Sequence, residues 1–407
     1  MTNKPDCSWN LKDLDGVESR GVKVMSTFAC GGGSSMGYKR AGCTIVAAND
    51  IDPEMAWHYK KNLNPPLYYL CPISDLITAD LPPALFDLDI LDGSPPCSTF
   101  SMAGSREKAW GKDKHFREGQ TKQVLSDLFF DYLDLVERLK PKVAIAENVK
   151  GMILGNAKGY TKMIMARFRE IGYRPQLFLI NAADCGVPQR RERVFFCAVR
   201  NDIDVPPLQL APTHRWISAG EACADVQDMT DAERGNVGFT APTDLKWWPL
   251  TKPGEDYGAA VIRSGAKVKL WSRKKLSAID PSLSLTATDM VTHWSDMRAL
   301  TFREWKRLGS FPDDYHAKSD KIGKYMIGMS VPPKMAQAVA EAVISQWLRP
   351  VEGPELLKNA KPNHHTRQQM PHVKPCSFTR RWAQLRQTLP ACWTLTKRRF
   401  ASITGMS

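Results

Sequence analysis

The sequence has no long hydrophobic run, since no apolar stretch approaches the roughly 18 residues that a membrane-spanning helix needs. Residues 1–16 are polar and acidic, unlike a secretory signal, which has an apolar core. The sequence also has no internal repeats. These absences predict a soluble, unsecreted protein of cytoplasmic location without a membrane partner.

No Cys-x-x-Cys pair occurs among the ten cysteines, and none of them has zinc-type spacing with the eight histidines. We therefore expect no metal site. Cysteines scattered through a chain of 407 residues are typical of a reducing cytosol, where most are small buried hydrophobic residues. A chemically active thiol has to be identified from its local sequence.

Acidic residues are outnumbered, 43 against 56 Lys and Arg, which gives a net charge of +13. The excess is uneven, because residues 351–407 contain ten basic and two acidic residues and so carry +8, leaving +5 for the first 350 residues. Basic charge favours a polyanionic partner, although bulk charge alone is weak support for nucleic-acid binding.

Within the first two hundred residues, apolar strand-like runs alternate with amphipathic stretches of helical length. Such alternation predicts an α/β fold with a doubly wound, parallel, Rossmann-like sheet. The predicted strands are residues 22–28, 44–48, 88–91, 143–146, 176–180 and 193–199. The predicted helices are residues 34–41, 53–62, 121–139 and 160–171.

The alternation stops near Asn201, where prolines, glycines and tryptophans follow at irregular spacing. This change predicts a second, smaller and irregular domain. Helical patterning returns at residues 301–308 and 333–347, and the chain after that is basic and polar without periodicity, as expected of disorder. We therefore divide the chain into residues 1–200, 201–297, 298–350 and 351–407.

A glycine-rich turn, Cys30-Gly31-Gly32-Gly33, follows the first predicted strand and opens the first predicted helix. Glycines let the backbone approach a ligand closely, and free amides at a helix start favour anionic groups. About twenty residues further on, the next strand ends at Asp50, which can accept hydrogen bonds from ribose hydroxyls. Together the two features favour an adenosine-containing cofactor, although a glycine turn alone is also consistent with tight packing.

The segment Asp92-Gly93-Ser94-Pro95-Pro96-Cys97 directly follows a predicted buried strand. Its two prolines hold the chain stiffly before the thiol, at the carboxyl edge of the sheet where α/β enzymes bind their ligands. Glu147 ends the strand after the long predicted helix, so we expect its carboxylate at the same edge. A buried glutamate with satisfied hydrogen bonds is the structural alternative.

Polar residues alternate along residues 189–193, so that Gln189, Arg191 and Arg193 share one face of a predicted strand and need anionic or hydrogen-bonding partners. Residues 257–279 contain no acid but six basic residues around Trp271, which suits phosphate contact and base approach. A solvated charged hairpin explains this segment equally well. The six basic residues are Arg263, Lys267, Lys269, Arg273, Lys274 and Lys275.

In this order, the glycine turn and the Pro-Pro-Cys, Glu-Asn-Val and Gln-Arg-Arg-Glu-Arg motifs resemble those of DNA cytosine-5 methyltransferases. The resemblance covers residues 22–348 apart from the variable middle, and it continues in the segments 298–304, 311–313 and 328–333. It implies the Rossmann-like methyltransferase sheet of that family. It also implies a target recognition domain around residues 206–280 and double-stranded DNA as the substrate.

In that family a thiolate adds to C6 of cytosine so that C5 can accept a methyl group. The resemblance makes Cys97 this thiolate, Glu147 the acid at N3 and the exocyclic amine, and Arg191 a donor to the base carbonyl. The base must first leave the helix, because its reacting atoms are inaccessible in a stacked duplex. Residues 98–119 would then form a lid over the flipped base, or else a long solvated loop.

The resemblance implies S-adenosyl-L-methionine as the methyl donor. It assigns to the cofactor Phe28 and Ile51 at the adenine, Asp75 at the adenine amino group, Asp50 at the ribose, Gly31, Gly32 and Gly33 around the methionine end, and also Pro95. It assigns Ser101, Gln189 and Arg193 to DNA contact, together with the six basic residues above. We expect a monomer of prokaryotic or phage origin. Whether a cognate restriction endonuclease accompanies it stays open.

Four positions depart from the family pattern. Ser26 stands where an acid is common, Cys30 where glycine is common, Ser98 where glutamine is usual and Met329 where asparagine is usual. These changes bear on affinity more than on reaction type.

Two alternatives stay open: a tRNA cytosine-5 methyltransferase of the same architecture, and a non-catalytic DNA-binding paralogue. A nicotinamide oxidoreductase is disfavoured, because the Gly-x-Gly-x-x-Gly spacing is missing.

Overall fold

The computed structural model describes residues 7–96, 128–155, 157–267, 273–288 and 290–348. Three predicted site residues, Cys97, Ser101 and Lys269, lie outside the described residues, as do the predicted lid and the predicted disordered tail. Residues Met1–Val351 form one compact unit. Among the described helices, none combines the length and the hydropathy of a membrane span.

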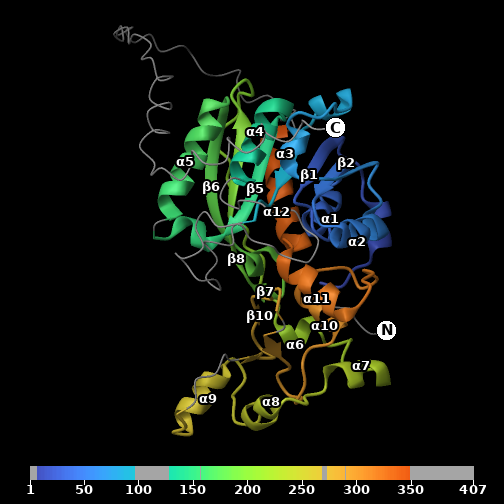
Figure 1. The fold of residues 1–407 in the computed structure, drawn as a ribbon, viewed down its shortest axis with the longest axis vertical. Helices are drawn as coiled ribbons and strands as arrows, with labels where there is room; N and C mark the ends of the chain where they lie inside the picture. The colour runs from blue at the N-terminus through green and yellow to red at the C-terminus, as the bar shows by residue number, and fades with distance from the viewer. Residues whose placement is uncertain (1–6, 97–127, 156, 268–272, 289, 349–407) are drawn as a thin grey trace, which may run out of the picture. The chain divides into compact units, whose positions relative to one another are not determined.

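A seven-stranded sheet organises this unit, with the strand order β3-β2-β1-β4-β5-β8-β6 (Figure 1). The strand order reverses between β1 and β4, and in α/β sheets such a switch point is where ligands bind. The strands are β1 (Val22–Thr27), β2 (Cys43–Asp50), β3 (Leu67–Leu70), β4 (Ile90–Gly93), β5 (Val143–Val149), β6 (Tyr173–Asn181) and β8 (Glu192–Arg200).

The sheet is mixed, so the predicted parallel arrangement is wrong for β8, which runs opposite to the other strands of this sheet. β1 to β5 pair in parallel, but β8 lies between β5 and β6 and is antiparallel to both. Between β6 and β8 the chain forms only a 3-10 turn (Ala182–Cys185) and β7 (Gln189–Arg190). This connection is too short for the crossover helix that a parallel pairing needs.

Alternate side chains of the strands enter two hydrophobic layers. Ala144 and Ala146 of β5 pack with α4 (Leu128–Leu139) and α5 (Ala157–Glu170) on one face. Their neighbours Val143 and Ile145 pack with α1 (Gly33–Arg40) and α12 (Pro333–Val343) on the other face. Because both faces are covered, the central strands are apolar throughout, which is why the sequence pattern identified them.

Local sequence signals set the ends of several helices near the edge of the sheet. Asp52 caps α2 (Pro53–Leu63) by accepting hydrogen bonds from two backbone N–H groups. A capping box of Thr301 and Glu304 starts α10 (Phe302–Leu308). The sequence analysis did not predict α11 (Asp320–Met329), since two glycines weaken its apolar pattern.

Between β8 and α10, the described residues form short elements and no large sheet, as the irregular composition predicts. Trp247, Trp248 and Tyr257 form a small separate core in this region. β10 pairs in parallel with β7 and so connects the region to the chain beside the large sheet. The elements are α6 (Ala219–Ala222), α7 (Asp231–Val237), α8 (Pro242–Trp247), α9 (Tyr257–Arg263), β9 (Lys274–Lys275), β10 (Ser282–Leu283) and β11 (Val291–Thr292).

Candidate active site

The glycine turn after β1 has an unusual backbone conformation. Phe28 and Cys30 have positive φ angles of 52° and 47°, and Gly32 has a φ of 87°. The angle at position 32 favours glycine, whereas the two residues with side chains are strained. Backbone strain of this kind is concentrated at ligand-binding and catalytic loops.

Gly33, the first residue of α1, has no room for a side chain, because other parts of the chain lie too close. A Cβ at this position would overlap the carbonyl oxygen of Val331 and would lie 2.9 Å from the Cβ of Ser330. The turn after β1 therefore contacts the segment between α11 and α12 directly. Residues from both ends of the compact unit come together here.

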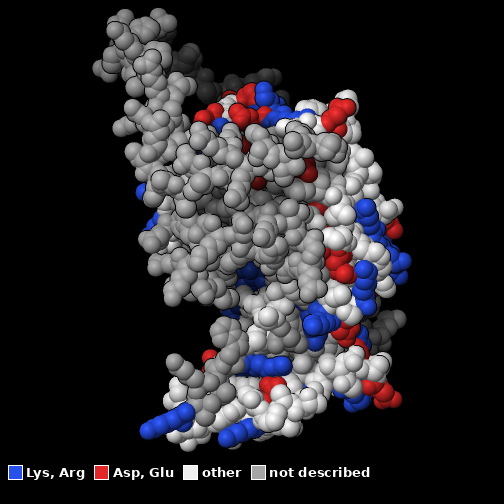
Figure 2. Space-filling view, in the orientation of Figure 1, with Lys and Arg blue, Asp and Glu red and all other residues white. Residues whose placement is uncertain are grey.

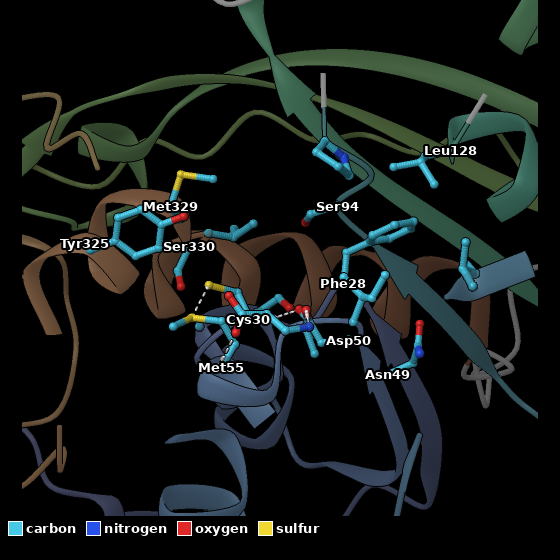
Figure 3. A pocket seen from close by; sticks show the side chains of 18 of the residues that line it. Phe28, Cys30, Asn49, Asp50, Met55, Ser94, Leu128, Tyr325, Met329 and Ser330 are labelled. Atoms are coloured by element: carbon cyan, nitrogen blue, oxygen red, sulfur yellow. Dashed lines mark hydrogen bonds between the residues drawn. The ribbon is translucent and has the colours of Figure 1, made fainter. Parts of the chain in front are cut away.

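These two segments line a pocket, and the predicted cofactor residues Phe28, Gly33, Asp50 and Ile51 belong to its wall (Figure 3). Figure 3 shows Tyr325, Met329 and Ser330 across the pocket from Phe28 and Leu128. Segment 328–333, part of the resemblance noted in the sequence, was the one sequence signal for this second wall, and it was assigned no role in binding. Lining residues that sequence reasoning missed include Ser34, Met55, Cys71, Ile73, Leu128, Tyr325 and Ser330.

Four predicted cofactor residues are not part of the pocket lining. Gly31 and Gly32 belong to the turn itself, and Pro95 lies between two residues that do line the pocket. Asp75 is exposed on α3 (Ile73–Leu76), and Ile73 is the residue of that helix that reaches the pocket.

Asp50 at the end of β2 holds the turn in place. Its carboxylate accepts hydrogen bonds from the backbone N–H of Cys30 at 2.7 Å and of Asp52 at 2.9 Å. Burial raises the pKa of Asp50, and these N–H groups oppose the rise because they stabilise the charged form. A carboxylate has about four lone-pair positions, so Asp50 can still accept from ribose hydroxyls. With the apolar Phe28 and Met55 also in the wall, the pocket fits an adenosine.

Cys30 replaces a common glycine of the family and forms part of the pocket wall. Its Sγ lies 3.6 Å from the Sδ of Met55. Burial raises the pKa of the Cys30 thiol to about 12, so it stays protonated at neutral pH. The substitution therefore adds a soft, uncharged atom to the wall.

The chain after β4 leads towards the predicted nucleophile. Ser94 and Pro96 line the pocket. The carbonyl oxygen of Pro95 accepts a 3.0 Å hydrogen bond from Nδ2 of Asn148, which ties this segment to the end of β5. Cys97 follows directly and lies outside the described residues. The residue before the predicted thiol is thus at the pocket and close to β5.

Glu147 is buried near the end of β5 and forms an ion pair with Arg193 of β8. The distance between Oε1 of Glu147 and Nε of Arg193 is 3.0 Å. Burial lowers the pKa of Arg193, and the Glu147 carboxylate opposes this effect. The ion pair explains how a carboxylate can be buried at this edge of the sheet.

The Arg191 side chain connects two segments of the chain by hydrogen bonds to their carbonyl groups. Its Nη1 donates to the carbonyl of Leu285 at 2.7 Å, and its Nη2 donates to the carbonyls of Gly328 and Ser330 at 3.0 and 3.1 Å. The side chain is buried, which lowers its pKa. Its buried Nε has no hydrogen-bond partner among the described residues. Arg191 therefore links the segment after β10 to the end of α11.

Gln189 is also buried, and both ends of its amide are engaged by main-chain groups. Oε1 accepts from the N–H of Leu285 at 3.1 Å, and Nε2 donates to the carbonyl of Leu308 at 3.1 Å. The predicted alternation is seen, since Gln189 and Arg191 are buried while Arg190 and Glu192 are exposed. The partners of Gln189 are, however, groups of this protein.

Within residues 257–279, two of the predicted basic DNA contacts are paired with acids. Arg263 forms an ion pair with Glu255 at 2.7 Å. Arg273 lies 3.4 Å from Oδ1 of Asp244, which also accepts a hydrogen bond from Tyr257. These arginines hold the region around α8 and α9 together.

The lysines of the same segment differ in their exposure. Lys275 is buried, with Nζ 3.5 Å from the centre of a Trp248 ring, and burial lowers its pKa. Lys267 and Lys274 are exposed. Figure 2 shows Lys and Arg side chains on the lower part of this face, where α8 and α9 lie in Figure 1. Exposed cations are therefore present where a polyanion could bind.

Comparison with solved structures shows the class of fold. A prophage-encoded protein of E. coli, described as a DNA modification methyltransferase, matches with a TM-score of 0.62 at 19% identity, covering 80% of this chain and 99% of that chain. A Spodoptera frugiperda DNMT2 structure matches with a TM-score of 0.58 at 17% identity, covering 80% and 100%. The mixed sheet with a smaller irregular region is therefore the fold of these methyltransferase structures.

Residues 22–345 match the model of the C-5 cytosine-specific DNA methylases, and the chain belongs to that family. The type II methyltransferase M.NgoFVII of Neisseria gonorrhoeae is 29% identical over 341 residues, covering 79% of this chain and 86% of that protein. The type II methyltransferase M.AplI of Arthrospira platensis is 31% identical over 332 residues, covering 79% and 85%. The predicted family, activity and donor are confirmed: the chain is a DNA (cytosine-5-)-methyltransferase that uses S-adenosyl-L-methionine.

Proposed function

We propose that this methyltransferase modifies cytosines at specific sites in double-stranded DNA, with Cys97 as nucleophile and with Glu147 and Arg193 holding the target base. One structural relationship carries the proposal. Pro96, the residue before Cys97, lines the pocket that fits adenosine, and Pro95 is hydrogen-bonded to Asn148, the neighbour of Glu147. This arrangement supports a shared site for the thiol, the acid and the methyl donor.

The reaction starts when the thiolate of Cys97 forms a bond to C6 of a flipped cytosine, which moves electron density to C5. S-adenosyl-L-methionine, when bound, supplies the methyl group that C5 takes up. A base then removes the C5 proton, and the electron pair of that bond restores the C5–C6 double bond. The sulfur leaves C6 as a thiolate, so the enzyme returns to its starting state.

Glu147 and Arg193 suit the charge that this addition creates. Negative charge develops on the ring nitrogen N3 and on the carbonyl oxygen, where a carboxyl group and a guanidinium can stabilise it. The sequence analysis gave the carbonyl to Arg191, but both Nη atoms of Arg191 are bonded to main-chain carbonyls. The ion pair with Glu147 favours Arg193 for this role. Arg191 then shapes the site, with Nε as its one unpaired group.

The irregular region within residues 201–297 is proposed as the target recognition domain. Its exposed Lys267 and Lys274 suit phosphate contact, whereas the pairing of Arg263 and Arg273 with acids supports a role in shaping the domain. We also infer a monomer that acts in the cytoplasm on the DNA of a bacterial or phage host. A cognate restriction endonuclease fits the type II relatives.

Bisulfite sequencing of DNA from cells that express the protein tests the proposed function. We expect one short sequence motif to become methylated at C5, and no methylation with Cys97→Ala. Duplex DNA with 5-fluorocytosine at that motif should form a covalent adduct with the wild type only. Labelled donor offered with DNA or with tRNA separates the alternatives. Transfer to tRNA alone, or an adduct that survives Cys97→Ala, would contradict the proposal.

A further inference from the structure

Asp92 is a buried carboxylate that the proposed reaction does not use. It lies in β4, where its direct partner in the parallel pairing with β1 is Ser26. Asp92 is 4% exposed, and three hydroxyl groups donate hydrogen bonds to its side chain. The hydroxyl of Thr27 also donates to its carbonyl oxygen at 2.9 Å. Asp92 therefore joins the strand before the glycine turn to the strand before Cys97.

The two carboxylate oxygens of Asp92 have different surroundings. Oδ2 accepts hydrogen bonds from Ser26 Oγ at 2.9 Å and from Ser34 Oγ at 2.8 Å, and Ser34 lines the donor pocket. Oδ1 accepts from Tyr38 Oη at 3.0 Å. Tyr38 is 1% exposed and belongs to the hydrophobic layer under α12. One oxygen is thus hydrogen-bonded to a residue of the pocket wall, and the other is hydrogen-bonded to a residue of the hydrophobic core.

The charge of Asp92 sets the direction of the hydrogen bonds at Ser34. An ionised carboxylate only accepts, so the hydroxyls of Ser26 and Ser34 both point their protons at Oδ2. The two serine oxygens lie 3.4 Å apart, and neither has a second proton to offer the other. Ser34 therefore keeps only oxygen lone pairs for the pocket. It can accept a hydrogen bond from a ligand but cannot donate one.

A second hydroxyl in the same wall points to a ligand at this end of the pocket. Ser330 is 4% exposed and lines the pocket. Its hydroxyl lies near the Cys30 thiol, but no hydrogen bond of normal geometry engages its buried Oγ among the described residues. Ser330 lies against the start of α1, since a Cβ on Gly33 would be 2.9 Å from the Cβ of Ser330. Buried hydroxyls are rarely left unpaired, so this one is expected to bind a ligand group.

We propose that Asp92 is a positioning residue that holds Ser34 as the acceptor for the α-ammonium group of S-adenosyl-L-methionine. This deepens the proposed function and rests on it, because the donor must bind in this pocket. In the amino-acid part of the donor, the ammonium is the one group that can donate a hydrogen bond. The sulfonium carries no proton, and the carboxylate only accepts. The free hydroxyl of Ser330 can in turn donate to that carboxylate.

The same arrangement accounts for one departure from the family pattern. Ser26 stands where the family commonly has an acid, and its register partner Asp92 carries an acid instead. Ser26 Oγ itself lies 3.4 Å from Ser34 Oγ, so a carboxylate on either strand can reach the Ser34 hydroxyl. A single carboxylate can therefore stand at position 26 of β1 or at position 92 of β4 and still reach Ser34.

Calorimetric titration with three ligands tests the role of Asp92. The ligands are S-adenosyl-L-methionine, S-adenosylhomocysteine, which keeps the ammonium but lacks the sulfonium, and 5′-methylthioadenosine, which lacks the amino-acid part. Asp92→Asn should weaken binding of the first two by about ten- to hundredfold, as expected for a hydrogen bond to a charged group. Binding of 5′-methylthioadenosine should stay within about twofold.

Further variants separate positioning from folding. Tyr38→Phe removes the partner of the other carboxylate oxygen, so it should lower the melting temperature and leave all three affinities within about twofold. Ser34→Ala should reproduce the affinity pattern of Asp92→Asn. A double variant with both substitutions should lose no more affinity than either single variant. Should Asp92→Asn not fold, Ser34→Ala carries the same test. Adding Ser26→Asp to Asp92→Ser should restore affinity for S-adenosylhomocysteine.

Specific results would overturn the inference. An equal loss for all three ligands would mean that Asp92 only supports the shape of the pocket. A loss for S-adenosyl-L-methionine but not for S-adenosylhomocysteine would mean that the charge acts on the sulfonium. Failure of the proposed function is a separate result, namely a wild-type protein that binds all three ligands normally and methylates no DNA.

Discussion

Glu147 and Arg193 are joined by a 3.0 Å ion pair across the antiparallel β5–β8 pairing. Arg191, two residues earlier, belongs to a different network of main-chain carbonyls. Two arginines that look equivalent in the motif therefore have separate tasks. One stands beside the predicted catalytic acid, and the other joins three segments of the chain.

Substitution of the two arginines should have different effects. Arg193→Ala is expected to lower kcat by about 10²- to 10³-fold, because a donor to developing charge is lost. Arg191→Ala should instead lower the free energy of unfolding by about 3 kcal/mol, since buried carbonyls lose their donor. Steady-state kinetics and chemical denaturation measure the two effects. The exposed Arg190→Ala is the matched control, and a stable but inactive Arg191→Ala would reverse the assignment.

Glu147→Gln should lower kcat by about 10²- to 10⁴-fold, because the amide cannot exchange a proton with N3 of the base. Glu147 is not among the residues that line the donor pocket, so the Kd for S-adenosylhomocysteine should stay within about twofold. Single-turnover methylation and calorimetry provide the two measurements. Full activity of the variant would show that the buried acid has only a structural role.

Asp92 should make stability depend on pH in a definite direction. Burial raises the pKa of Asp92 to about 6, whereas an unfolded aspartate titrates near ~3.9. The folded state therefore binds this proton more tightly, and its contribution to the free energy of unfolding rises as pH falls from about 6 to about 4. Between about pH 7 and pH 4, wild type should gain about 2 kcal/mol relative to Asp92→Asn. Denaturation curves of both proteins across this range measure the difference, and a constant difference would contradict it.

Lys267 and Lys274 should contribute to DNA affinity through phosphate contacts. Each Lys→Ala substitution is expected to reduce the slope of log affinity against log salt by about 0.9. Arg263→Ala is the control within the same region, because Arg263 is already paired with Glu255 and should change the slope less. Fluorescence anisotropy with a labelled duplex at several salt concentrations gives the slopes. An unchanged slope would remove these lysines from the interface.

The fold could be predicted from the sequence where the apolar pattern of a segment matches the burial of its strand. The runs that become β1, β4 and β5 are apolar because helices cover both faces of the sheet, so their residues identified them. Strand direction could not be predicted in this way, since β8 is as apolar as a parallel strand and differs only in its short connection to β6. β3 was missed because Leu67–Leu70 is a short edge strand and only partly buried.

The candidate site was predictable where it depends on one continuous segment. Phe28, Gly33 and Asp50 were found in this way, because their motifs lie at strand ends. Ser34 and Ser330 were not predicted as pocket residues, because the function of a serine depends on its contacts in the folded protein. Arg191 and Arg193 have the same chemistry in the sequence, and only the ion pair with Glu147 distinguishes them.

The pocket is lined by residues between 28 and 128 and by residues between 325 and 331. A growing chain on the ribosome exposes the first group long before the second is synthesised. Until then the pocket lacks its second wall, so a ligand of this pocket is expected not to stabilise a partly made protein. We therefore expect ligand binding to stabilise only chains that have been synthesised past α11.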